Sequence, residues 1–511
     1  MLEPAGTSPI RDGRQVMGGL AFLLIGGGFY IFTYNSGYGY DACEYLLIGR
    51  GLLDGFRLSD FVLSKGWATY TMAAGALALI PRPDHAWISL VITLLFALAV
   101  GGTWWAGRRL FGNGVAAISA LLVAVCAFFM ELNFLEPEIP VYLAGLLAVY
   151  ILECGRPSRS ASRCFAAGLS LGAGFAFKAV AGFYLAAVAG HLLLSENRFT
   201  ARERLRGVLW IASGFALAVA IPVAYFAATG QLRHHVLWSF LFPFLYYPAN
   251  TVWLRKLYTK LLWFFILLFI ASLVASTTAL RRTILSNPRV NLVLWMGGVS
   301  LLSLLKTQSS HYVFPGAAFL SFFIAQTLYC WWTRKPTRPA FPAWIPAAAA
   351  ALLLISAWLY SPAVFARLFH KRDVRAEEQI AARLQTLARP GDRVLFLEGG
   401  MSLYWLAKRY PVVPFMHTDV QATYLLFQRP DILAAALDDP RLTLVEFDPQ
   451  HPQFDDPHFF ETEHHRTLIA LFSKRLAERF TPLRDPALPL NLWTRKPGVA
   501  NSVPVLVSAK P

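Results

Sequence analysis

The sequence predicts an all-α, polytopic membrane domain followed by a C-terminal α/β domain outside the cytoplasm. Hydrophobic residues make up 56% of the 511 residues and charged residues only 15%, against about 25% charged in soluble domains. Apolar runs near the bilayer-spanning length of about 20 residues recur as far as Tyr360. Beyond it the chain becomes rich in Asp, Arg, Pro and His. We therefore expect a membrane domain over 1–360 and a soluble domain over 361–511.

The apolar runs predict about 11 crossings. Single crossings are expected at 16–34, 86–106, 114–131, 139–153, 207–228, 261–279, 290–305, 312–331 and 344–360. The stretch 165–194 is too long for one crossing, and Lys178 interrupts it within "GFAFKAVAGFY". This pattern predicts two short helices that meet at Lys178.

The loops between the crossings predict the orientation. Alternate short loops, such as "GRRLFGN", "CGRPSRSASRC" and "LRRTILSNPR", are rich in Arg and Lys, which is typical of cytoplasmic loops. The N-terminus falls on the same side. The first loop, 35–85, and the C-terminal domain then lie outside the cytoplasmic (inner) membrane. The apolar piece "WATYTMAAGALALI" in this loop is too short to cross and is expected at the interface.

Charge and motif content exclude several function classes. The net charge of +16 does not indicate a nucleic-acid partner, because the basic residues lie in short loops between apolar runs. The five cysteines form no CxxC pair, so neither a disulfide framework nor a zinc site is expected. "FLEGGM" lacks the glycine spacing of a dinucleotide site.

The C-terminal domain shows mixed elements. "RAEEQIAARLQTLARPGDRVLFLEGG" predicts an amphipathic helix, a turn and a strand, while "RLTLVEFDP" and "LPLNLWTRK" predict further strands. A small α/β fold of about 150 residues is the expectation.

Asp41 and Glu44, in "YDACEYLLIGRGLLDG", follow the first crossing and have two interpretations. The D-x-x-E spacing fits a capping box, in which the aspartate caps a helix and the glutamate bonds back. The functional interpretation makes Asp41 a positioned general base. We expect the two interpretations to be compatible, because a capping side chain has a fixed rotamer.

Further charged residues gather at the predicted outer ends of the crossings. Glu131, Glu136 and Glu138 lie in "MELNFLEPEIP", where carboxylates are costly to bury and often functional. The accompanying cations are Lys65, Lys178, Lys306 and His311. Interface-facing carboxylates and snorkelling lysines are the structural alternatives. The functional hypothesis is a pocket for a phosphate on a lipid tail.

These motifs, in this order, resemble the GT-C superfamily of membrane glycosyltransferases, in the branch of protein O-mannosyltransferases (dolichyl-phosphate-mannose-protein mannosyltransferases) and lipid A aminoarabinose transferases. The resemblance rests on "YDACEYLLIGRGLLDG", "SKGWATY", "AGRRLFGNGVAAISALLVA", "FLEPEIPVYLAGLL", "AFKAVAGFYL" and "SSHYVFPGAAFL". It implies Asp41 as the catalytic base. The candidate substrate-binding residues in these motifs are Glu44, Tyr45, Lys65, Glu136, Glu138, Lys178, His311 and Tyr312.

The resemblance implies transfer of a sugar from a polyprenyl-phosphate donor to a lipid, glycan or protein acceptor at the outer face of the membrane. No cofactor is required; a divalent metal ion is compatible with the pattern, although Asp41 has no D-x-D partner. Two other functions are considered. A transporter or flippase would use broken helices and intramembrane charges too, but no inverted repeat is visible. A non-catalytic scaffold with this fold is the second.

Overall fold

The computed structural model describes residues 9–497 except 62, 81–83, 131, 155–159, 197, 237–240, 242–250, 277, 306–309, 334–365, 399–400, 414–429, 456–462 and 487. The chain divides into two compact units. Unit 1 comprises 1–37, 82–219 and 249–372, and unit 2 comprises 38–81, 220–248 and 373–511. The predicted domain boundary at residue 360 stays a prediction.

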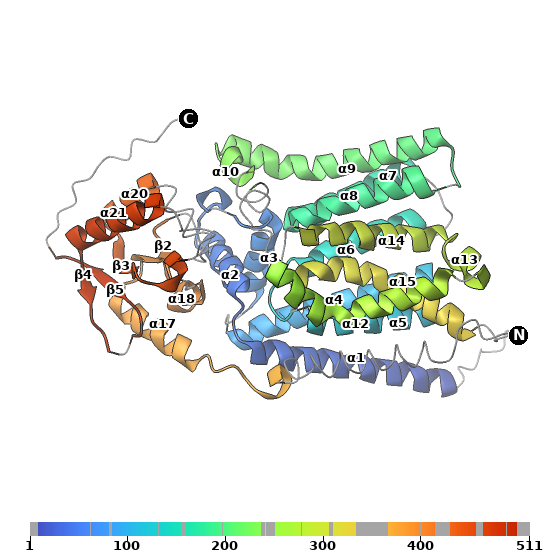
Figure 1. Cartoon of the computed structure of the whole chain (residues 1–511), viewed down its shortest axis with the longest axis horizontal. Helices are drawn as coiled ribbons and strands as arrows, with labels where there is room; N and C mark the ends of the chain where they lie inside the picture. The colour runs from blue at the N-terminus through green and yellow to red at the C-terminus, as the bar shows by residue number, and fades with distance from the viewer. Residues whose placement is uncertain are drawn as a thin grey trace, which may run out of the picture. The chain divides into compact units, whose positions relative to one another are not determined.

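Unit 1 is a bundle of helices that run side by side in Figure 1. Neighbours in sequence pack as antiparallel pairs: α4 against α5, α6 against α7, and α14 against α15. The helices are α1 (Pro9–Ser36), α4 (His85–Leu110), α5 (Asn113–Phe129), α6 (Glu138–Glu153), α7 (Ala161–Phe177), α8 (Gly182–Gly190), α12 (Thr251–Ser276), α13 (Thr278–Ile284), α14 (Pro288–Ser300) and α15 (Phe314–Thr333). Helix α9 (Ala201–Ala228) continues from this unit into unit 2.

Three stretches of the described chain form helices long and apolar enough to cross a membrane: 85–110, 201–228 and 311–333. Shorter apolar helices cover 113–129, 179–195 and 264–276. The predicted total of about 11 crossings is therefore not confirmed. The predicted crossing 344–360 lies outside the described residues.

The predicted break at Lys178 is confirmed. Helix α7 ends at Phe177, Lys178 adopts an extended backbone with φ −157° and ψ 136°, and a 3₁₀ turn (Ala179–Ala181) leads into α8. The Lys178 N–H donates to the carbonyl of Gly174, and its carbonyl accepts from Ala181. A helix break in an apolar segment requires such partners, because water is not there to replace them.

Unit 2 contains the first loop and the C-terminal α/β domain. The loop folds into α2 (Tyr40–Leu53) and α3 (Trp67–Leu79), which pack together. Gly49 permits this approach, since a Cβ there would lie 2.7 Å from the backbone nitrogen of Ala74. Helix α2 also packs against α18 (Met401–Ala407), and the Tyr410 hydroxyl donates to Asp54 at 2.7 Å.

The C-terminal domain is built on a five-stranded sheet of order β2-β1-β3-β5-β4. Strand β1 (Arg393–Phe396) is parallel to β2 (Tyr410–Pro411) and β3 (Leu442–Glu446). Strand β5 (Leu492–Arg495) is antiparallel to β3 and to β4 (Phe480–Leu483). The predicted amphipathic helix is α17 (Arg375–Leu387), and the three predicted strands are β1, β3 and β5.

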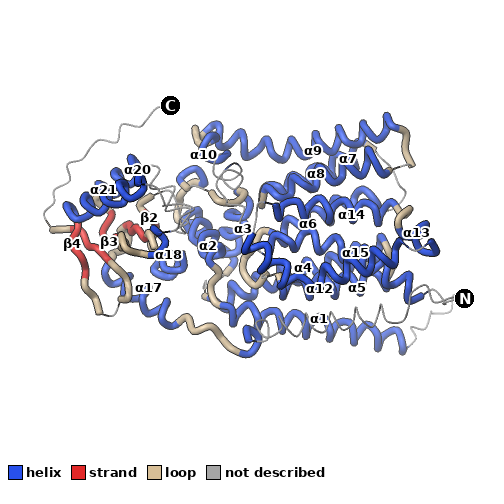
Figure 2. Tube along the Cα trace, in the orientation of Figure 1, coloured by secondary structure: helices blue, strands red, loops and turns tan. Residues whose placement is uncertain are grey.

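Helices cover both faces of this sheet. Figure 2 shows α20 (Pro430–Asp438) and α21 (Glu463–Arg479) on one side, and α17 and α18 on the other. The first face carries an apolar core in which Leu395 and Val445 of the strands meet Leu437 and Phe472 of the helices. On the opposite face, the Phe396 ring contacts Tyr404 of α18.

Candidate functional site

Asp41 lies in the first turn of α2, and it is not the cap of that helix. The N-cap is Gly39, and no side chain caps the first turn. The capping-box interpretation of the D-x-x-E spacing is therefore wrong. A carboxylate in the first helical turn still interacts favourably with the helix dipole.

The Asp41 carboxylate is held by two neighbours of unit 2. The Lys65 ammonium lies 3.5 Å from Oδ2, and the Tyr45 hydroxyl donates to the same oxygen at 3.4 Å. The Asp41 side chain remains 24% exposed, whereas Lys65 is 9% exposed. An adjacent ammonium favours the ionised carboxylate, which is the form that accepts a proton. The three predicted residues Asp41, Tyr45 and Lys65 thus do lie together.

Glu44 turns away from the helix start and into the packing between α2 and the segment before α3. It is 1% exposed. Its Oε1 accepts a hydrogen bond from the Ser64 hydroxyl at 2.8 Å and from the Tyr70 hydroxyl at 2.8 Å. Tyr70 also accepts from the backbone N–H of Lys65 at 3.0 Å. Glu44 therefore fixes the backbone that presents Lys65, and its predicted contact with substrate stays a prediction.

Sequence reasoning missed Ser64 and Tyr70. Both lie within "LSKGWATY", immediately beside Lys65. The signal that could have identified them is the buried glutamate itself, because a carboxylate in an apolar helix needs donors nearby.

In unit 1, Glu138, Lys178 and His311 form a second cluster. Glu138 lies in the first turn of α6 and is fully buried, and the Lys178 ammonium at the end of α7 forms an ion pair with its Oε1. His311 Nε2 lies 3.8 Å from the same oxygen. Lys178 and His311 follow Glu138 by 40 and 173 residues in the sequence. The three side chains come together because the start of α6, the end of α7 and the turn η6 (Ser310–Val313) meet at one end of the bundle.

Tyr312 completes this second cluster. The Lys178 Nζ lies 3.4 Å from the centroid of the Tyr312 ring, and that ring stacks on His311. An aromatic face attracts the ammonium group and fixes its position. Glu136 precedes Glu138 by two residues and is 4% exposed. Glu131 and Lys306 lie outside the described residues.

A third charged cluster of unit 1 has a structural explanation. Glu153, His191 and Glu196 place one metal-ligating atom each within 4.8 Å of one another. Arg198, however, forms ion pairs with both carboxylates, at 3.1 Å from Glu153. A guanidinium that donates to two carboxylates holds both of them together through charge-assisted hydrogen bonds. We interpret this cluster as an ion-pair network that joins the end of α6 to the π-helix η3 (His191–Ser195).

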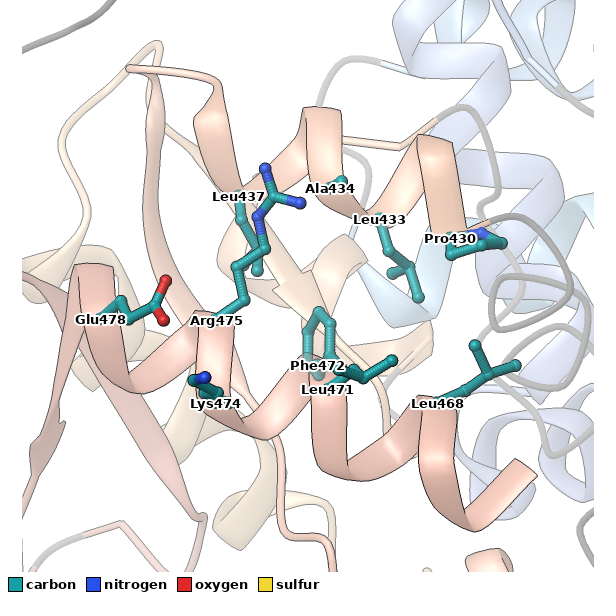
Figure 3. A pocket seen from close by; sticks show the side chains of 10 residues that line it. All are labelled: Pro430, Leu433, Ala434, Leu437, Leu468, Leu471, Phe472, Lys474, Arg475 and Glu478. Atoms are coloured by element: carbon teal, nitrogen blue, oxygen red, sulfur yellow. The ribbon is translucent and has the colours of Figure 1, made fainter. Parts of the chain in front are cut away.

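The C-terminal domain has a groove between α20 and α21, with a volume of about 390 Å³ (Figure 3). Leu433, Leu437, Leu468 and Phe472 line it, and Lys474, Arg475 and Glu478 lie at its end. The lining is mainly apolar and contains no group suited to proton transfer or to phosphate binding beyond these exposed charges.

Comparison with known proteins gives a partial match to a family model and a shared fold. The family model described as dolichyl-phosphate-mannose-protein mannosyltransferase matches residues 68–226. This stretch extends from α3 to the end of α9 and includes Glu136, Glu138 and Lys178. A sequence search of curated proteins finds no match.

Solved structures with the same fold cover nearly the whole chain. ArnT from Cupriavidus metallidurans bound to undecaprenyl phosphate matches with a TM-score of 0.59 and 13% identity, over 94% of this chain and 98% of that one. The oligosaccharyltransferase AglB from Archaeoglobus fulgidus, in complex with an inhibitory peptide and a dolichol-phosphate, matches with a TM-score of 0.52 and 12% identity. That match covers 95% of this chain and 75% of AglB.

Proposed function

Because the chain has the GT-C fold of membrane glycosyltransferases, we propose that it transfers a sugar from a polyprenyl-phosphate donor to a lipid, glycan or protein acceptor. The observation that most supports this proposal is the Asp41 carboxylate, which is partly exposed and held by Lys65 and Tyr45. A base of this kind would serve an acceptor hydroxyl. In this proposal the reaction takes place at the outer face of the cytoplasmic membrane.

The proposed reaction is a displacement at the anomeric carbon. The acceptor oxygen forms a bond to that carbon, the bond from the carbon to the phosphate oxygen breaks, and the polyprenyl phosphate leaves with the bonding electrons. Asp41 takes the hydroxyl proton. General-base assistance contributes about 10²–10⁴-fold to the rate, and Lys65 and Tyr45 hold the accepting oxygen in place for this step.

The proposal also assigns a role to the basic residues of unit 1. Lys178 and His311 would bind the donor phosphate and stabilise the negative charge that it gains as it leaves. The neighbouring structures support this ligand class, since one holds undecaprenyl phosphate and another a dolichol-phosphate. Glu138 positions the Lys178 ammonium, Tyr312 limits its movement, and Glu136 would contact the sugar or the acceptor.

The test compares Asp41→Asn with Asp54→Asn. Both changes remove one carboxylate from the α2 region while keeping side-chain size, but Asp54 lies at the helix end, where it pairs with Arg50. Mass spectrometry of envelope lipids, glycans and proteins from cells with and without the gene first identifies the product. Asp41→Asn should then lower its formation at least about 100-fold.

Asp54→Asn should leave product formation within about twofold, provided that both variants reach the membrane in equal amounts. A normal turnover with Asp41→Asn would remove Asp41 as the base. No change in any envelope component on deletion of the gene would overturn the glycosyltransferase proposal itself.

A further inference from the structure

The groove between α20 and α21 leaves apolar side chains open on the surface of the C-terminal domain. Leu433 of α20 and Phe472 of α21 face each other across it (Figure 3). Both are buried and belong to the core of the sheet, whereas Leu471 at the edge of the groove is 58% exposed. An apolar group that covers such a surface gains free energy by leaving water. The groove therefore suits an apolar ligand.

The charged residues at the end of the groove largely offset one another. Arg475 pairs with Asp438 at 3.4 Å, and Asp438 also pairs with Arg479 at 2.8 Å. Lys474 is matched in formal charge by Glu478, which also lines the groove. An anionic ligand would have to compete with Asp438 for the arginines. The groove therefore favours an uncharged segment over a phosphate or an acidic peptide.

The end of β5 lies at the same end of α21. After Arg495, the Lys496 N–H donates to the carbonyl of Arg479 at 3.0 Å. The Lys496 ammonium donates to the carbonyls of Ala477 and Glu478, at 2.7 and 3.2 Å. These bonds hold Lys496 at the C-terminal end of the helix, where a cation is favoured. The chain that follows therefore departs from the end of the groove that Glu478 lines.

The sequence that follows is apolar where it is needed. Residues 498–511 read "GVANSVPVLVSAKP", in which 503–507, "VPVLV", combine a proline with four aliphatic side chains. Lys510 carries the one charged side chain of this segment. Proline and β-branched residues restrict the conformations of the free chain, which lowers the entropy lost when such a segment binds.

The lengths of the segment and of the groove agree. The groove follows α21 from Leu468 to Glu478, which is about 15 Å along the helix axis. Five extended residues span about 17 Å, so 503–507 match this length. The linker 497–502 reaches about 20 Å from Lys496. A short linker gives an effective concentration in the millimolar range, so a dissociation constant on the order of 10⁻⁴ M keeps the groove occupied.

We propose that residues 503–507 bind in the groove between α20 and α21 of the same chain, with their aliphatic side chains against Leu471 and Phe472. Docking there covers the exposed face of Leu471 and holds the segment that follows β5 against both helices. The groove is lined by none of the residues assigned to the glycosyltransferase reaction, so the docking does not depend on that function.

The first experiment uses the intact chain, purified in detergent, with Ser508→p-benzoylphenylalanine as a photo-crosslinker beside the segment. After irradiation of an equal mixture of isotopically light and heavy chains, mass spectrometry should find crosslinks to α20 or α21 within one chain. Leu471→Glu places a charge in the groove and should lower their yield at least about tenfold. The matched control, Ala470→Glu, adds the same charge at the neighbouring exposed residue outside the groove and should leave the yield unchanged.

The second experiment uses a chain that ends at Pro497 and a fluorescent peptide of residues 498–511. Fluorescence anisotropy should give a dissociation constant on the order of 10⁻⁴ M for this chain, and binding to the intact chain should be at least about tenfold weaker, because its own segment competes. Equal affinity for the two chains overturns the proposal. Crosslinks that join light to heavy chains would assign the groove to a second copy, and crosslinks that miss both helices would leave the segment elsewhere; either result overturns it as well.

Discussion

Two buried glutamates, one in each unit, occupy opposite electrostatic environments. Glu138 of unit 1 is fully buried and lies against the Lys178 ammonium and His311. Glu446 of unit 2 is 3% exposed, and the charged group beside it is a second glutamate. The first carboxylate lies against an ammonium group, and the pKa of the second is raised by burial and by a like charge.

The comparison teaches that burial alone does not define the role of an acidic residue. A carboxylate with a fixed cation forms a rigid, charge-balanced element, and removal of either partner leaves a buried charge. A carboxylate beside another carboxylate lacks that balance and holds a proton to a higher pH instead. Glu44 is intermediate, because its donors are the neutral hydroxyls of Ser64 and Tyr70.

The largest expected effect is at Lys178. Lys178→Met leaves Glu138 buried without its ammonium partner, and it should destabilise the protein by about 3–5 kcal/mol. Thermal unfolding of the detergent-purified chain measures this. The double variant Lys178→Met with Glu138→Gln removes both charges and should recover most of the loss. A single variant within about 1 kcal/mol of the parent would show that the ion pair contributes little.

The double variant also separates structure from function. It is expected to be stable but to lack the ammonium group, so its affinity for a polyprenyl-phosphate donor reports on the cation alone. A raised KM in the stable double variant would support phosphate binding by Lys178. An unchanged KM would assign Lys178 to the stability of the α6–α7 contact.

Glu44, whose donors are neutral hydroxyls, tests the comparison between the two buried glutamates. Tyr70→Phe removes one of the hydroxyl donors to Glu44 and should destabilise the protein by about 2 kcal/mol, since hydrogen bonds to charged groups contribute about 1.5–3 kcal/mol. Combined with Glu44→Gln, the same substitution should cost less, because the acceptor is then neutral. Equal costs in both backgrounds would show that Tyr70 acts through packing, including its edge-on contact with Tyr45.

Much of the fold could be predicted because it depends on local pattern. Apolar runs indicated the helices, Lys178 marked the break between α7 and α8, and alternation indicated β1, β3 and β5. Asp41 was also singled out, but its capping role was wrong because Gly39 already provides the extended backbone before the helix. Glycine is an accepted N-cap residue, so the D-x-x-E spacing alone does not decide whether Gly39 or Asp41 caps the helix.

The partners of the buried charges could not be predicted, because they depend on contacts between distant segments. Glu138 and His311 are 173 residues apart in the chain, yet 3.8 Å separates their side chains. The Glu398 and Glu446 pair was not anticipated at all. Each follows or ends a short apolar strand, and only the parallel pairing of β1 with β3 brings the two together.

An effect of opposite sign is expected at Glu446. A carboxyl group whose pKa is raised from 4.5 to about 8 in the folded state binds a proton that the unfolded chain has already released. The stability it contributes is therefore present at pH 4 and is lost as the pH rises toward 8. Glu446→Gln should remove this dependence and, at pH 8, stabilise the C-terminal domain relative to the parent chain.

Thermal unfolding at pH 4.5, 6 and 8 measures the difference between Glu446→Gln and the parent chain, with Glu478→Gln as the control that should show no pH-dependent change. The contrast with unit 1 is direct, because Glu138→Gln leaves Lys178 buried without its anion and should destabilise the protein at every pH. A destabilising Glu446→Gln at pH 8 would mean that a cation of the protein compensates Glu446 after all. The two glutamates would then belong to one electrostatic class.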